Sequence, residues 1–259
     1  MAEAKTAVAH KPVWTDLSTS DPQGAREFYS AVFGWKVEVN PDPQYGGYAL
    51  AKVHGKDVAG IGPKPMPEAP VAWTVYIGTP NAAETAKKAE AAGAKIIAPV
   101  MEVGDQGHMA IIQDPSGAYL GLWQAGKMQG SQSEGSSSMG WAELNARGFD
   151  KAESFYKKLF GWGEKKTPGA GENPEYTEFQ LHGDSVAGGM EMNPMVPAEV
   201  PSYWMVYFNV DNVDKAFDKV IEHGGKEMLS PMDMPGGRFA IVSDPQGASF
   251  GLLKMEESR

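Results

Sequence analysis

The amino-acid sequence predicts an α+β protein built from two copies of one domain. The stretch FYSAVFGW (28–35) returns as FYKKLFGW (155–162), with differences at only three central positions. Around each copy of this phrase, short helical patterns alternate with runs in which every second residue is apolar, as is typical of half-buried strands. Because the strand patterns outnumber the helical ones, we expect curved sheets with many antiparallel pairs.

The repeat extends over nearly the whole chain of 259 residues. VHGKDVAG (53–60) matches LHGDSVAG (181–188), and further matches follow at a spacing of about 130 residues. A period of this length is too long for a solenoid and indicates a duplicated domain. We therefore expect a first domain over 1–125 and a second over 139–259. Between them, residues 126–138 are rich in Gly, Ser and Gln, which is typical of a flexible linker.

The first helix of each copy has clear boundary signals. Asp21 and Pro22 are a favoured N-cap and first helical residue for a helix over 23–33, and Gly34 ends it. Gly161 ends the corresponding helix of the second copy. Both helices are amphipathic, with apolar residues spaced by three and four. These residues are Ala25, Phe28, Tyr29 and Val32 in the first copy and Ala152, Phe155, Tyr156 and Leu159 in the second.

The remaining patterns give each copy the same order of elements. Strands are expected over 35–39, 48–53 and 58–61, and another over 71–77. A second helix over 82–92 follows, capped by Asn81 and ended by Gly93, and three more strands come after it. The predicted order is a strand, a helix and three strands, twice in each domain and four times in the chain.

Composition excludes several classes of protein. A net charge of −10 and a pI near 5.0 argue against a nucleic-acid partner. There is no run of 18 apolar residues to span a membrane, and the first residues lack the apolar core of a secretory signal. Without cysteine there is no disulfide framework and no thiolate nucleophile. Dinucleotide and P-loop motifs are absent. We expect a cytoplasmic protein.

This order, with the motifs W-x-[DE]-L, FY-x-x-x-FGW and DPxGA, resembles the vicinal oxygen chelate superfamily. That superfamily includes glyoxalase I, extradiol dioxygenases and bleomycin-resistance proteins. The resemblance covers about 11–125 and 139–255, and is closest to tandem-domain bacterial proteins, some described as hydroxylases. It implies two tandem domains, each of two βαβββ modules forming a curved, open, barrel-like sheet. The motifs specify the fold and leave the reaction open.

Catalytic members of the superfamily hold a divalent metal with His, Glu or Gln on four strands. None of the eight corresponding positions here carries a usual metal donor. The resemblance therefore implies that no metal and no other cofactor is bound, with a divalent metal in an unconventional site as the alternative. Glu191 is a candidate for such a displaced ligand. The eight positions are Trp14, Gly60, Thr74 and Gly121 in the first domain and Trp141, Gly188, Met205 and Gly251 in the second.

Alternation along the strands identifies candidate pocket residues around these positions. Asp16 shares a face with Trp14, and Glu143 and Asn145 share a face with Trp141. Aromatic walls, glycines and a carboxylate suit a flat, partly apolar molecule with a polar group. Further wall candidates are Tyr76, Tyr119, Trp123, Met205 and Tyr207.

Other residues are candidates for polar roles. Asp16 and Glu143 are candidate general acids or bases, since burial among aromatic rings would raise the pKa of either carboxyl. His108 and its counterpart Arg238 could offer a basic group to an anionic ligand. The alternative interpretation is structural: both tryptophans would fill the core, and both carboxylates would bind backbone amides.

Two further pairs have simpler interpretations. His54 and His182 each precede a glycine between two strands and are expected at turn tips. Asp114 and Asp244 each begin a DPxG sequence, which favours a type I turn.

Three functional hypotheses follow. The first is metal-independent binding or sequestration of an aromatic or hydrophobic small molecule, of the bleomycin-resistance kind. The second is an enzyme, either a glyoxalase-like lyase or a hydroxylase or dioxygenase, acting for example on methylglyoxal or an antibiotic-related metabolite. In the third, one domain only supports the other, and the second domain is the better site because Glu143, Asn145, Glu191 and Arg238 occur together there. The expected partner is a small-molecule ligand, in a monomer or a homodimer without nucleic acid or membrane.

Overall fold

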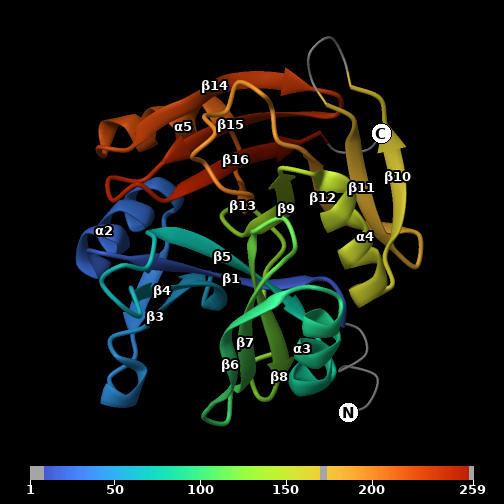
Figure 1. Cartoon of the computed structure of the whole chain (residues 1–259). Helices are drawn as coiled ribbons and strands as arrows, with labels where there is room; N and C mark the ends of the chain where they lie inside the picture. The colour runs from blue at the N-terminus through green and yellow to red at the C-terminus, as the bar shows by residue number, and fades with distance from the viewer. Residues whose placement is uncertain (1–8, 170–173, 257–259) are drawn as a thin grey trace. The chain divides into compact units, whose positions relative to one another are not determined.

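The structure is a computed structural model that describes residues 9–169 and 174–256, and it confirms the α+β class. The four predicted βαβββ modules are present (Figure 1). The first copy comprises β1 (Pro12–Thr19), α2 (Pro22–Phe33), β2 (Lys36–Val39), β3 (Ala49–Val53) and β4 (Lys56–Pro63), then β5 (Ala72–Gly78), α3 (Ala82–Ala91), β6 (Lys95–Val103), β7 (Gly107–Gln113) and β8 (Tyr119–Ala125). The second comprises β9 (Met139–Ala146), α4 (Phe149–Phe160), β10 (Gly163–Thr167), β11 (Tyr176–Leu181) and β12 (Asp184–Glu191), then β13 (Tyr203–Asn209), α5 (Val213–Glu222), β14 (Lys226–Met234), β15 (Gly237–Ser243) and β16 (Ser249–Met255).

Each module has one strand topology. The strands run β2-β3-β4-β1 and β5-β8-β7-β6 in the first copy, and β10-β11-β12-β9 and β13-β16-β15-β14 in the second. The first and last strands of a module pair in parallel, as in β1 with β4, and the other pairs are antiparallel. The edge strands β2, β6, β10 and β14 leave the sheets open, as predicted.

The helices begin and end where the sequence predicts. The Asp21 carboxylate accepts a hydrogen bond from the Gly24 amide at 3.0 Å, and Gly34 adopts a left-handed conformation with a φ of 71°. Helix α4 differs, because its N-cap is Gly148, which has no side chain. Glu191 from β12 caps it instead, accepting from the Gly148 and Phe149 amides at 3.0 and 2.7 Å. Glu191, the candidate displaced metal ligand, therefore stabilises a helix terminus.

The chain forms two compact units, and each unit combines modules from both copies. Unit 1 contains 75–130 and 141–205, and unit 2 contains 14–74 and 206–259, with short flanking segments assigned to each. The predicted domain boundaries follow the sequence repeat and stay a prediction; they also include residues 1–8, 170–173 and 257–259, which lie outside the described residues.

A buried hydrogen-bonded chain joins the two modules of unit 2. The Trp73 indole donates to Tyr29 Oη at 2.9 Å, and Tyr29 Oη donates to Asp244 Oδ2 at 3.0 Å. The tyrosine belongs to the repeated FY phrase of the first copy, and the aspartate belongs to the DPxG turn of the second. Burial and the nearby Asp244 carboxylate raise the pKa of Tyr29 well above its usual value. The tyrosine of the repeated FY motif thus forms a hydrogen bond to the other copy, in addition to its place near the end of a helix.

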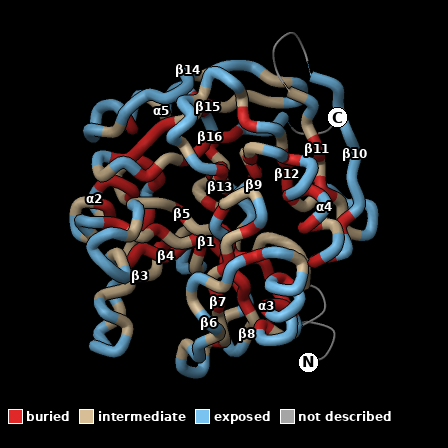
Figure 2. Tube along the Cα trace, in the orientation of Figure 1, coloured by how far each residue is buried: buried red, intermediate tan, exposed pale blue. Residues whose placement is uncertain are grey.

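Unit 1 contains the same chain with the copies exchanged. The Trp204 indole donates to Tyr156 Oη at 2.9 Å, and Tyr156 donates to Asp114 Oδ2 at 2.7 Å. Asp114 also accepts from the Ser116 and Ala118 amides, so the predicted turn role of this residue is confirmed and extended. Buried stretches of α2 and α4, and of the strands they cover, show where the core of each unit lies (Figure 2).

Turns and the predicted linker are also fixed by local bonds. His54 and His182 occupy hairpin tips with φ of 50° and 55°, each followed by a glycine with positive φ, as a type I′ turn requires. Within 126–138, the Gln132 amide donates to the Asp57 carbonyl at 2.8 Å and the Ser137 amide to the Asn209 carbonyl at 2.7 Å. Composition alone predicts flexibility here, whereas these hydrogen bonds hold residues 131–138 within unit 2.

Candidate functional site

The strongest candidate site features are two hydrogen-bonded triads of a tryptophan, a tyrosine and a carboxylate. In the first triad the Trp14 indole donates to Tyr48 Oη at 3.2 Å, and Tyr48 Oη donates to Asp16 Oδ2 at 3.3 Å. The first triad lies entirely within unit 2. Its tryptophan and carboxylate are predicted site residues, and Tyr48 joins them.

The second triad lies in unit 1 and has the same order. The Trp141 indole donates to Tyr176 Oη at 2.8 Å, and Tyr176 Oη donates to Glu143 Oε2 at 3.0 Å. Sequence reasoning missed Tyr48 and Tyr176. A signal was available, because each precedes the glycine of its VAG motif by 12 residues (60 − 48 and 188 − 176).

The tyrosine of each triad lies over a glycine on the last strand of the module. Gly60 is the register partner of Asp16, and Gly188 is the register partner of Glu143. A Cβ atom at Gly60 would lie 1.8 Å from Tyr48 Oη, and one at Gly188 would lie 1.9 Å from Tyr176 Oη. Only glycine leaves room for the phenol at these two positions.

The other two modules repeat this arrangement with different tyrosines. A Cβ at Gly121 would lie 2.1 Å from the Tyr76 ring, and one at Gly251 would lie 2.0 Å from the Tyr207 ring. In these two modules the tyrosine itself is the register partner of the glycine, in the position that Asp16 and Glu143 take in the other two. In all four modules, therefore, a tyrosine occupies the space that a side chain at this glycine position of the last strand would need.

These four glycines are among the eight positions that correspond to metal ligands in catalytic members. The residues present do not fit a metal there, because glycine supplies no donor and the phenol occupies the space that a longer side chain would need. Elsewhere in 9–169 and 174–256, no group of three or more His, Asp or Glu side chains is arranged to hold an ion.

Burial controls the ionisation of the tyrosines. Desolvation, with the Asp16 carboxylate second, raises the pKa of Tyr48 well above its usual value. Desolvation and Glu143 raise the pKa of Tyr176 in the same way, and to a lesser degree that of Tyr203. The Tyr48 and Tyr176 phenols are therefore neutral at pH 7, and each can donate a hydrogen bond to the carboxylate of its triad.

Two polar residues on one strand face form a polar row beside each triad, and this row differs between the copies. The row consists of Asp16 and Ser18 on β1 in the first copy, and of Glu143 and Asn145 on β9 in the second. In the second copy, Asn145 Nδ2 donates to Glu143 Oε1 at 3.1 Å. The equivalent residue in the first copy is Ser18, two positions after Asp16 on β1. Its Oγ is buried and finds no hydrogen-bond partner in the described part of the chain. Ser18 is a further residue that sequence reasoning missed.

The predicted apolar wall residues have varied environments. Trp123, Tyr76, Met205 and Tyr207 are almost fully buried. Tyr119, at the start of β8, is 46% exposed, so it lies at the margin of the face it shares with Trp123.

The two predicted basic residues are placed differently. Arg238 forms a bidentate pair with Asp214, at 2.8 and 2.9 Å, and a 2.7 Å contact with Asp233. These carboxylates, Asp214 first, raise the pKa of the guanidinium. His108 is half-buried and lies opposite Glu102 and Gln124 on the neighbouring strands. Arg238 is thus engaged in a surface ion-pair network.

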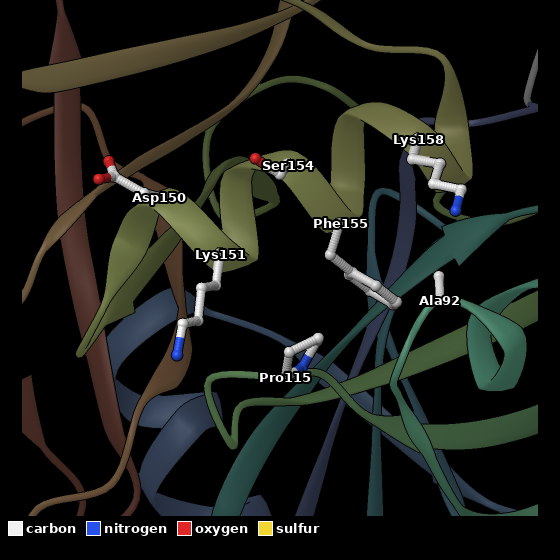
Figure 3. A pocket seen from close by; sticks show the side chains of 7 residues that line it. All are labelled: Ala92, Pro115, Asp150, Lys151, Ser154, Phe155 and Lys158. Carbon is white, nitrogen blue, oxygen red and sulfur yellow. The ribbon is translucent and has the colours of Figure 1, made fainter.

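An open hollow in unit 1 contains none of the predicted site residues. Phe155 of α4 points between Pro115 and Ala92, and Lys151 and Lys158 extend to either side of it (Figure 3). The lysine side chains point apart instead of converging on one position. The hollow therefore does not form a built polar site.

Comparison with known proteins identifies the family. The model of the Glyoxalase/Bleomycin resistance protein/Dioxygenase superfamily matches residues 11–122 and 138–252. The chain belongs to this superfamily. The match in both copies confirms the tandem arrangement inferred from the repeat.

Two kinds of relative are similar over almost their full length. The putative glyoxylase CFP32 of Mycobacterium tuberculosis is 38% identical, with 94% of each chain covered. The anthracycline biosynthesis protein DauV of Streptomyces sp. strain C5 is 33% identical, with 95% of this chain and 94% of DauV covered.

Solved structures share the fold at low identity. The Mn(II)-bound glyoxalase from Novosphingobium aromaticivorans has a TM-score of 0.67 at 13% identity, with 96% of this chain and 84% of that chain covered. The 2,3-dioxygenase LapB from Pseudomonas sp. KL28 has a TM-score of 0.63 at 13% identity, covering 95% and 92%. Among the described residues, no helix has the length and apolar character needed to cross a bilayer.

Proposed function

We propose that the protein binds a flat aromatic small molecule without a metal, at the faces that carry the triads. The observation that carries this proposal is the tyrosine over glycine in all four modules. At the positions that correspond to metal ligands, the protein has glycines covered by tyrosine rings. Aromatic rings favour flat, apolar ligands. The carboxylate of each triad supplies a polar group that accepts hydrogen bonds.

The relatives support the same class of ligand. DauV and DnrV, at 33% and 34% identity, are named for anthracycline biosynthesis. Anthracyclines contain a planar, fused-ring quinone carrying hydroxyl groups. A molecule of this shape offers ring faces to the tryptophans and hydroxyl donors to the carboxylates.

A direct test is a titration of tryptophan fluorescence with a monohydroxyanthraquinone, using protein dialysed against a chelator and then freed of it. We expect saturable quenching with a micromolar Kd, and no change of more than twofold when Mn²⁺ or Zn²⁺ is added. Binding that requires a divalent metal would contradict the proposal.

An enzyme is the second candidate, and the phenol–carboxylate pair is the observation that favours it. A carboxylate polarised by a phenol could accept a proton from a bound substrate, as a general base does. Turnover of a hydroxyquinone or of a glyoxal hemithioacetal by the chelated protein, lost in Asp16→Asn or Glu143→Gln, would favour the enzyme over the binding protein.

A further inference from the structure

The two copies differ at one point of the polar row beside the triads, and this point has a consequence for ligand binding. Asn145 and Glu143 are bonded to each other in the second copy. Ser18 takes the place of Asn145 in the first copy, and its buried hydroxyl has no partner among the described residues. A buried hydroxyl without a partner costs free energy unless something binds it.

The residue paired with Ser18 is smaller than the residue paired with Asn145 in the second copy. Ser18 is the register partner of Gly62, whereas Asn145 is the register partner of Met190. A Cβ at Gly62 would lie 3.0 Å from the Tyr48 ring, so the same ring extends over Gly60 and Gly62. The first copy therefore has a small floor beneath an aromatic ring next to the unpartnered hydroxyl.

The donors of the first triad are already used within it. The Trp14 N–H points to Tyr48, and the Tyr48 O–H points to Asp16. A carboxylate offers acceptors only. Of the polar side chains in this row, the Ser18 hydroxyl is thus the one that can donate to a ligand. A ligand carbonyl placed there would receive its hydrogen bond from Ser18.

We propose that Ser18 is a ligand-binding and specificity-determining residue, and that the first copy binds a planar ligand whose edge carries a carbonyl together with a hydroxyl. The carbonyl accepts from Ser18, and the hydroxyl donates to the Asp16 carboxylate. Ser18 and Asp16 lie two residues apart on one strand face, a separation of about 6–7 Å. This inference rests on the proposed function, since it names the class of ligand that the aromatic face takes.

The corresponding polar groups of the second copy all have structural partners, as Asp16 has in the first copy, so Ser18 differs from them. Asn145 binds Glu143, Glu191 caps α4, and Arg238 pairs with Asp214 and Asp233. The residues that favoured the second domain as the better site in the sequence are therefore engaged within the protein. In the first copy, a ligand would supply the hydrogen-bond partner that the Ser18 hydroxyl lacks among the described residues.

The test uses two probes, a monohydroxyanthraquinone and the hydroxyanthracene with the same ring skeleton but no carbonyls. Both are titrated into the full-length wild type, Ser18→Ala and a control, Ser154→Ala, whose serine lies exposed on α4. In Ser18→Ala we expect quinone affinity to fall roughly threefold to tenfold, the effect of losing one uncharged hydrogen bond. Affinity for the hydroxyanthracene should change by less than twofold, and the control should match wild type.

Melting scans without ligand separate a binding role from a structural one. Removing an unpartnered hydroxyl should leave the melting temperature of Ser18→Ala unchanged or raise it. A fall of several degrees would show that the hydroxyl has a structural partner and would overturn the inference. Equal quinone binding by wild type and Ser18→Ala would overturn the role of Ser18 alone, leaving the proposed function intact. If wild type binds neither probe, the proposed function fails and this inference fails with it.

Discussion

The two copies agree closely in the hydrogen bonds that hold each unit together and differ in the polar row beside the triads. Trp73, Tyr29 and Asp244 in unit 2 have direct counterparts in unit 1, with all distances between 2.7 and 3.0 Å. Ser18 and Asn145 occupy equivalent positions with different partners. The packing of both units therefore depends on the same Trp-Tyr-Asp hydrogen-bonded chain, whereas the polar residues on the sheet face differ between the copies.

The largest expected effect comes from removing the aspartate of the Trp-Tyr-Asp hydrogen-bonded chain. Asp244→Ala would leave the Tyr29 hydroxyl and the Gln246 and Ala248 amides without their acceptor. Because these are buried or part-buried donors, we expect the free energy of unfolding to fall by about 3–5 kcal/mol in urea titrations.

Asp114→Ala is the matched variant in unit 1, where the Tyr156 hydroxyl and the Ser116 and Ala118 amides lose the same acceptor. The two losses should agree within about 1 kcal/mol. If only one of the two variants unfolded like wild type, the hydrogen-bonded chains of the two units would not be equivalent.

The next effect tests the tyrosine over glycine. Gly60→Ala and Gly188→Ala would each force a phenol out of its place, which we expect to cost about 1–3 kcal/mol of unfolding free energy. In a Tyr48→Ala background, Gly60→Ala should cost much less, because the clashing ring is gone; the double-mutant cycle measures the difference. Additive costs would show that the glycine is required for another reason.

Local signals explain how much of the fold could be predicted from the sequence. Asp21, Asn81, Gly34 and Gly161 act within a few residues of their own position, so the helices could be placed from them. The pairing of Tyr29 with Asp244 spans 215 positions and crosses from one copy to the other. A repeat cannot show whether a residue contacts its own copy or the other one, and so the composition of the units was not predictable.

The candidate site was predictable in part for the same reason. Alternation along β1 and β9 placed Trp14 with Asp16 and Trp141 with Glu143. The tyrosines that connect them come from β11 and from the residue before β3, and identifying them required the tertiary structure. Ser18 could not be recognised, because an unpartnered hydroxyl is a property of the packed structure.

Alkaline pH should destabilise both units through their buried tyrosines. Tyr29, Tyr48, Tyr156 and Tyr176 have folded-state pKa values above the ordinary value of 10.0, so they keep their protons when the unfolded chain loses its own. The unfolded state then binds fewer protons. The free energy of unfolding should fall above pH 10 by about 1.4 kcal/mol per pH unit for each such tyrosine, while below pH 10 their contribution is fully present.

Variants at the triads sharpen this into a comparison of the copies. Tyr48→Phe and Tyr176→Phe each remove one titrating group, so both should make the pH dependence of urea unfolding shallower by the same amount. Tyrosinate absorbance should appear together with unfolding. Ionisation of these phenols in the folded protein would contradict their burial.

The smallest expected effect concerns His108 and Arg238, a further pair of equivalent positions at which the copies differ. The Arg238 contacts with Asp214 and Asp233 are on the surface, so Arg238→Ala should lower the melting temperature slightly at low salt and not measurably at about 1 M NaCl. Because its guanidinium is already held by two carboxylates, binding of the monohydroxyanthraquinone should be unchanged, and His108→Ala should behave in the same way. A salt-sensitive loss of quinone affinity in Arg238→Ala alone would show that this arginine leaves its ion pairs to meet the ligand. The second copy would then have a polar contact of its own, and the specialisation assigned here to the first copy would extend to both.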